Sequence, residues 1–169
     1  MNGKKRETMP DMEEVIDRYG DHILRLCLLY LGNRPSAEDA FQETMLKAWT
    51  HRGDFRGESA LGTWLTRIAI NVCRDMLRSR SLFFRRFLTG ELPEDVPAPE
   101  PPSVEDGLDV RSAVARLPRR YREAVILFYY EDYTAAEIAA LLHIPRATVD
   151  TRLHRARALL KDLLKEDLS

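Results

Sequence analysis

Apolar residues recur along this chain at steps of three and four, which is the spacing of one face of an α-helix, and no convincing strand-like alternation appears. The pattern predicts a first helix over residues 12–31, a second over 36–49 with Ser36 as its N-cap, and a third over 61–80. Residues 51–60 form a loop punctuated by glycine. The apolar side of the first helix contains Val15, Ile16, Tyr19, Ile23, Leu26, Cys27 and Tyr30.

The same periodicity continues in the second half of the chain. Residues 110–117 predict a fourth helix, and Pro118 suits the first turn of a fifth. Two further apolar helices are predicted on either side of the break His143-Ile144-Pro145. The last helix has one core stripe at steps of four and three, made of Val149, Leu153, Ala156, Leu160 and Leu163.

A segment of different composition separates the two halves. Residues 91–109 contain five of the nine prolines and seven acidic residues, with no basic residue. We therefore predict an all-α protein of two small helical domains joined by a flexible, acidic, proline-rich linker. The predicted parts are a flexible N-terminus (1–11), a first domain (12–84), the linker (85–107) and a second domain (108–169).

The formal net charge of −1 conceals this division. Residues 1–90 carry 15 Lys and Arg against 12 Asp and Glu, and residues 110–169 carry 11 against 8. Two mildly basic domains thus flank the acidic linker. A protein that bound DNA by charge alone would be far more basic, so a DNA-binding function would need another source of affinity.

Several functional classes find little support in the sequence. The four histidines are scattered without metal-ligand spacing, and neither a phosphate-binding glycine loop nor a nucleophile motif is present, so we expect no enzyme, metal or cofactor. No stretch is long and apolar enough for a membrane span, and no secretory signal follows Met1, so no membrane insertion is expected. Cys27 and Cys73 occupy apolar helical positions and predict buried free thiols in a reducing compartment, the cytoplasm.

The face of the last helix opposite its core stripe is the strongest functional signal in the residues themselves. Small outer residues would let the backbone approach base edges, and flanking arginines could contact phosphate or guanine. Together with the short preceding helix and tight turn, this pattern favours a helix-turn-helix over an ordinary solvated face. The outer residues are Ala147, Thr148, Thr151, His154, Arg155 and Ala158, and the flanking ones are Arg146, Arg152 and Arg157.

Two segments also resemble a known family. "AEDAFQETMLKAW" and "WLTRIAINVCRDMLR" resemble region 2 of bacterial RNA polymerase sigma factors of the extracytoplasmic-function group. "LPRRYREAVILFYYEDYTAAEIAALLHIPRATVDTRLHRARALL" resembles their region 4. The resemblance covers roughly residues 12–80 and 105–165 in the family's order. It implies a sigma factor that directs core polymerase to −35 and −10 promoter elements and aids promoter melting.

The resemblance assigns roles to residues of the first domain. It implies that one helix face docks on the β′ clamp helices of core polymerase, although the residues alone indicate only a solvated face. It also implies that loop 51–60 captures a base flipped out of the −10 element. We expect Trp64 to pack in the core of the domain. For Asn71 and Arg74, contact with the DNA strand and packing within the domain are equally favoured. The implied polymerase residues are Asp39, Gln42, Glu43 and Lys47, and the implied −10 residues are Arg52, Phe55, Arg56, Asn71, Arg74 and Arg78.

The second domain is assigned to the −35 element and the polymerase β flap. The implied −35 residues are Arg146, Ala147, Thr148, Thr151, Arg152, His154 and Arg155. The chain departs from the family pattern at His143, where glycine is common, at Arg146-Ala147, and at Asp150, where an acid would repel phosphate. The preference at −35 therefore cannot be copied from a relative.

Other readings stay open from the sequence. The family's acidic linker occupies the polymerase RNA path, whereas a plain tether would also explain the proline-rich segment. The resemblance allows an anti-sigma factor, membrane-bound or soluble, as a further partner. The main alternative is an autonomous helix-turn-helix regulator with an N-terminal sensor or dimerisation module, and a third is a helical adaptor that binds no DNA. Only a sigma factor would depend on core polymerase for its promoter footprint.

Overall fold

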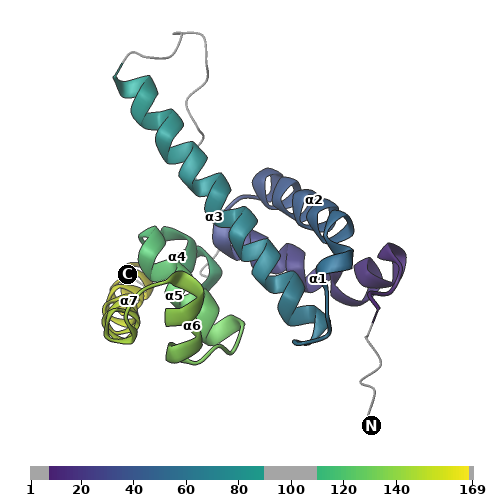
Figure 1. Ribbon diagram of the computed structural model, residues 1–169. Coiled ribbons are helices and arrows are strands. Elements are labelled where there is room, and N and C mark those ends of the chain that lie inside the picture. The colour runs from purple at the N-terminus through teal and green to yellow at the C-terminus, as the bar shows by residue number, and fades with distance from the viewer. Residues whose placement is uncertain (1–7, 90–109, 168–169) are drawn as a thin grey trace. The chain divides into compact units, whose positions relative to one another are not determined.

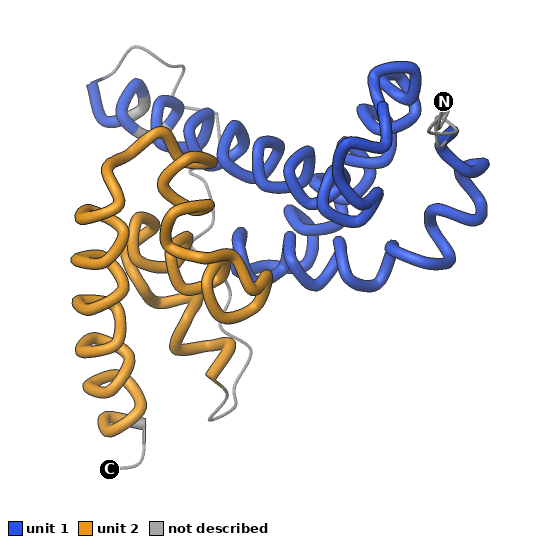
Figure 2. Tube along the Cα trace, turned by 60° about the horizontal axis from the view of Figure 1, so that its bottom comes forward, with its two compact units in different colours: residues 1–101 blue, residues 102–169 orange. Residues whose placement is uncertain are grey.

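The computed structural model describes residues 8–89 and 110–167, and these form helices and their connections without a strand. The chain divides into two compact units, residues 1–101 and 102–169 (Figure 2). The predicted all-α class with two helical domains is confirmed. Most of the predicted linker, and residues 1–7 of the predicted flexible N-terminus, lie outside the described residues.

Unit 1 begins with helix α1 (Met12–Leu31), which has the predicted limits. The Asp11 carboxylate accepts the backbone N–H of Glu14 at 2.9 Å and so caps the first turn. Gly32 ends the helix with φ 78°, a left-handed conformation that glycine adopts without a Cβ clash. Ile16, which was predicted on the apolar side of this helix, is 43% exposed.

Helix α2 (Arg34–Thr50) starts two residues earlier than predicted. Its N-cap is Asn33, whose side-chain oxygen accepts the backbone N–H of Ser36 at 2.9 Å. The predicted N-cap, Ser36, is instead buried in the first turn, where its hydroxyl accepts a hydrogen bond from Arg80. Pro35 fits this turn because the first amides of a helix need no helical partner.

Helix α3 (Leu61–Leu88) follows a short 3₁₀ turn, η1 (Arg52–Asp54), and packs against both α1 and α2. Figure 1 shows α3 as one long helix that extends beyond the other two. The helix therefore continues past its predicted end at Arg80. The core of unit 1 is made of fully buried side chains from all three helices, including Val15, Ile23, Leu26, Ala37, Ala40, Leu65, Ala69 and Ile70.

The two cysteines face each other in this core. Cys27 of α1 and Cys73 of α3 are both free and fully buried, as predicted. The pKa of Cys73 is raised far above its usual range, chiefly by a hydrogen bond with Cys27 and then by burial. The Cys73 thiol is thus held protonated in an apolar setting.

Unit 2 contains α4 (Val110–Arg116), α5 (Arg119–Val125), the π-helical turn η2 (Ile126–Tyr130), α6 (Ala135–Leu142) and α7 (Arg146–Asp167). Pro118 precedes α5 as its N-cap residue rather than lying in its first turn. The predicted stripe of α7 is confirmed, with Val149, Leu153 and Ala156 buried and its last two leucines half-buried. Each fully buried Val or Leu contributes about 1.5–3 kcal/mol, so this stripe holds α7 against α4, α5 and α6.

The connection between α6 and α7 is a tight turn. A capping box starts α6, in which Thr134 and Glu137 each accept the other's backbone N–H. His143 ends it with φ 55°, in the left-handed region that favours glycine. Its backbone N–H and that of Ile144 both donate to the Ala139 carbonyl oxygen. The predicted helix-turn-helix is therefore present, and within the described residues no helix is long and apolar enough to cross a lipid bilayer.

Candidate nucleic-acid and polymerase interfaces

The first candidate surface is the outer face of α2. Asp39, Gln42 and Glu43 are exposed there, and half-buried Lys47 lies 3.8 Å from the Glu43 carboxylate. The structure thus places all four predicted polymerase residues on one helix, with the acids and amide available to a partner.

Two apolar residues of this helix surface were not among the predicted ones. Leu46 and Trp49 follow Gln42 at steps of four and three, and their side chains are 60% and 45% exposed. The signal was present in the sequence, since apolar residues at helical spacing from polar ones mark a mixed surface rather than a core stripe. An exposed apolar centre among polar residues is typical of protein interfaces.

The end of this surface meets the predicted −10 loop. The guanidinium of Arg52 lies 3.9 Å from the Trp49 ring centroid, and its Nη1 donates to the Trp49 carbonyl oxygen at 2.8 Å. This cation–π contact fixes the orientation of an otherwise flexible arginine.

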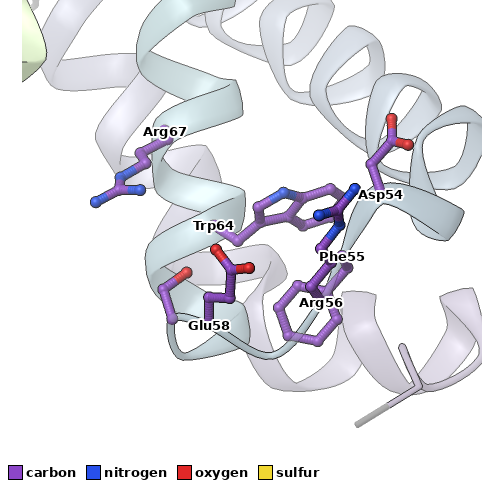
Figure 3. Close-up of a pocket in the computed structure, with 7 residues that line it drawn as sticks. Asp54, Phe55, Arg56, Glu58, Trp64 and Arg67 are labelled. Carbon is purple, nitrogen blue, oxygen red and sulfur yellow. The ribbon is translucent and has the colours of Figure 1, made fainter. Parts of the chain in front are cut away.

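The second candidate surface is an open cavity of about 570 Å³ at the start of α3 (Figure 3). Phe55 is almost fully buried, and its ring centroid lies 5.4 Å from that of half-buried Trp64, with the planes tilted by 54°. Figure 3 shows charged side chains of both signs around these rings. The cavity is lined by Asp54, Phe55, Arg56, Glu58, Ser59, Trp64 and Arg67. An aromatic wall with nearby donors and acceptors can hold a planar, polar-edged group such as a nucleobase.

Of the predicted −10 residues, Arg52 lies against Trp49, and the others divide between this cavity and the helix beyond it. Phe55 and Arg56 line the cavity. Trp64 packs against Phe55, as predicted, and also lines the cavity. Arg67 also lines the cavity and was not predicted, although its spacing from Trp64 is informative. Arg67, Asn71, Arg74 and Arg78 follow Trp64 at steps of three and four, so they share one face of α3. Asn71 and Arg78 are exposed, Arg78 lies 4.0 Å from Asp75, and Arg74 is half-buried.

The third candidate surface is the outer face of α7. Ala147, Thr151, His154 and Arg155 are exposed opposite the buried stripe, as their spacing predicts. The Thr151 hydroxyl donates to the Ala147 carbonyl oxygen at 2.9 Å, which leaves its lone pairs free to accept.

The flanking side chains of α7 have partners on neighbouring positions. Exposed Arg146 lies 4.0 Å from the Asp150 carboxylate, and Thr148 and Arg152 are half-buried. The Arg157 Nε donates to the Tyr129 hydroxyl at 2.6 Å, so this arginine is oriented by η2. All seven predicted −35 residues therefore lie on the first half of one helix, with Arg157 turned to a tyrosine.

The chain is similar to known proteins over nearly its whole length. Residues 15–83 match the family model described as Sigma-70 region 2, and residues 107–160 match Sigma-70, region 4. It is 31% identical to the ECF RNA polymerase sigma factor SigW of Bacillus subtilis (strain 168), over 90% of this chain and 88% of SigW.

Solved structures agree with this match. The sigma factor RpoE, crystallised with the anti-sigma factor NepR from Bartonella quintana, is similar with a TM-score of 0.70 and 25% identity, over 93% of this chain and 98% of that chain. CnrH, in complex with the cytosolic domain of CnrY, has a TM-score of 0.61 and 27% identity, over 92% and 88% of the two chains. With both regions present in order, the chain belongs to the extracytoplasmic-function group of sigma-70 family RNA polymerase sigma factors, which are non-enzymatic initiation factors that bind core polymerase and promoter DNA.

Proposed function

We propose that the outer face of α2 docks on the β′ clamp helices of core polymerase. Asp39, Gln42 and Glu43 would supply its polar contacts, and the exposed side chains of Leu46 and Trp49 its apolar centre. Exposed apolar side chains gain most by being covered, so this centre would carry much of the affinity. The small basic excess of residues 1–90 fits such a role, because the polymerase then contributes to holding the factor at DNA.

We further propose that the cavity beside loop 51–60 receives one unstacked base of the −10 element. The observation that carries this proposal is the cavity of about 570 Å³ walled by Phe55 and Trp64. Unstacking a base costs a few kcal/mol, and a specific pocket offsets that cost. Arg67, Asn71, Arg74 and Arg78 would then guide the melted strand along α3, since they lie on the face that continues from Trp64.

The outer face of α7 is proposed to read the −35 element in the major groove, with unit 2 also contacting the β flap. The small side chains of Ala147 and Thr151 permit close approach of the helix, and Arg152 and Arg155 reach for base edges or phosphates. Arg146, Thr148 and His154 complete this surface. The acidic segment 91–109 is proposed to follow the polymerase RNA path.

Regulation by an anti-sigma factor is a further part of the proposal. Its support is the solved relative RpoE, which was crystallised with the anti-sigma factor NepR. We infer that a similar partner holds this chain away from polymerase by covering the exposed apolar residues of α2. The site of action would be the cytoplasm, where bacterial polymerase works.

The decisive experiment is reconstitution with core polymerase. Purified chain and core enzyme should co-purify, produce run-off transcripts from a subset of genomic DNA fragments, and protect −35 and −10 sequences only together. An autonomous regulator would instead footprint its site alone and leave core enzyme unbound. The match of both units to sigma regions gives that alternative no support.

A further inference from the structure

Tyr121 of α5 lies between two arginines. The Arg120 guanidinium is 4.8 Å from the Tyr121 ring centroid. The Tyr121 hydroxyl has a pKa below its usual value, chiefly because the Arg155 side chain of α7 hydrogen-bonds to it, with a second contribution from Arg120, while burial acts in the opposite direction. Tyr121 is only 7% exposed, so packing holds its ring in place next to the two arginines.

Two like charges thus converge on one phenol without an acidic partner. Among the residues that the structure describes, neither Arg120 nor Arg155 forms an ion pair. Two other exposed arginines of unit 2 do have acidic neighbours, since Arg116 lies 3.5 Å from Glu166 and Arg146 lies 4.0 Å from Asp150. Converging cations repel each other, and an anion bound between them removes that repulsion.

The position of the pair indicates which anion it receives. Arg155 is exposed on the outer face of α7, and Arg120 is exposed on the neighbouring helix α5, which packs against α7. An α-helix lying in the major groove has DNA phosphates along both of its sides. Arginines on an adjoining helix therefore meet the backbone rather than base edges.

We propose that Arg120 and Arg155, positioned by the Tyr121 hydroxyl, form a binding site for one backbone phosphate of the −35 DNA. The inference rests on the proposed role of α7 at this element and extends the DNA surface to α5. Arg120 and Arg155 contact the phosphate, whereas Tyr121 acts only through them as a positioning residue.

The test is a scan of the −35 duplex in which each phosphate in turn is replaced by a neutral methylphosphonate, with reconstituted holoenzyme binding measured for each duplex. Wild-type protein should lose roughly three- to tenfold in affinity at the phosphate that the pair binds. Arg120→Ala and Arg155→Ala should each bind natural DNA more weakly, with a salt slope lower by about one, and should both become insensitive to replacement of that same phosphate. Arg111→Ala, which removes a charge from α4, is the matched control and should keep the wild-type pattern.

The positioning role of Tyr121 has its own readout. Tyr121→Phe keeps the buried ring and the overall charge, so it should weaken binding by about two- to fivefold through loss of the hydroxyl alone. This loss should vanish in the Arg155→Ala background, whereas a purely structural effect would persist there.

Three outcomes would overturn the inference. In the first, Arg120→Ala gives the same methylphosphonate scan as the wild-type protein. In the second, Arg120→Ala and Arg155→Ala become insensitive to replacement of two different phosphates. In the third, Tyr121→Phe weakens binding equally in the wild-type and Arg155→Ala backgrounds. If Arg152→Ala and Thr151→Ala also leave −35 binding unchanged, the proposed role of α7 fails as well. If those two variants weaken binding and Arg120→Ala does not, only the phosphate site is wrong.

Discussion

Asp150 offers a prediction with a definite sign. It is an exposed acid in the second turn of α7, on the helix proposed to enter the major groove. Replacing it by asparagine should strengthen promoter binding, because a carboxylate near DNA phosphates is repelled. The substitution keeps size and polarity, so the charge is the main thing that changes.

The structure allows the competing terms to be weighed. The Asp150 carboxylate lies 4.0 Å from the Arg146 Nε, and both side chains are more than half exposed. Such a surface pair contributes only about 0.3–0.5 kcal/mol to the stability of the helix, and its loss frees Arg146 for DNA. A carboxylate roughly 8 Å from each of two phosphates, in water, is repelled by about 1 kcal/mol in all. The expected gain is therefore about fivefold in affinity.

The assay is fluorescence anisotropy of labelled promoter duplex titrated with reconstituted holoenzyme over a salt series. The gain for Asp150→Asn should fade as salt rises, since screening weakens the repulsion. Asp162→Asn is the matched control, because it removes the same charge from the exposed C-terminal half of α7. It should change affinity far less.

Two results would refute this reasoning. If Asp150→Asn binds all promoter sequences as tightly as the wild-type protein or more weakly, repulsion between the Asp150 carboxylate and DNA phosphates does not limit binding. Weakening confined to one G·C pair would show that Asp150 accepts a hydrogen bond from a cytosine amino group and reads sequence.

Three further predictions test the other sites. Gln42→Ala combined with Glu43→Lys should weaken binding to core polymerase by about tenfold or more while circular dichroism shows normal helicity, and an unchanged affinity would exclude this face of α2 from the interface. Asn71→Ala should reduce permanganate reactivity of the open complex more than closed-complex binding, whereas equal loss of both would give Asn71 a structural role. His143→Gly should raise the free energy of unfolding of unit 2 by about 0.5–1 kcal/mol by relieving its left-handed backbone, and urea unfolding that shows no gain would argue against strain at this position.

Periodicity predicted the elements well because most helices here have one buried face. The limits of α1 and the stripe of α7 followed directly from apolar spacing and cap residues. The start of α2 did not, since Asn33 and Ser36 are both good N-cap residues and only the fold decides which one caps. The end of α3 was missed because residues 81–88 contain neither glycine nor proline, so helix propensity carries the chain beyond its core contacts.

The candidate sites were predictable to a different degree. Residues that share a helix face, such as Thr151 and Arg155, could be grouped from spacing alone. The cavity could not, because it depends on how loop 51–60 folds back until the Phe55 ring meets Trp64. Likewise, no local pattern brings Arg155 of α7 to Tyr121 of α5, which lies far from it in the sequence.

The buried thiols of unit 1 have a practical consequence. Cys27 and Cys73 are the only cysteines of the chain, so a thiol-specific reagent has no cysteine to react with in unit 2. Both side chains are fully buried and the pKa of Cys73 is raised, so alkylation proceeds only when the α1–α3 contact opens. The alkylation rate in native buffer is therefore an intrinsic gauge of how often unit 1 opens, with and without a bound partner. It requires no engineered label, and it follows one half of the molecule while the other remains invisible.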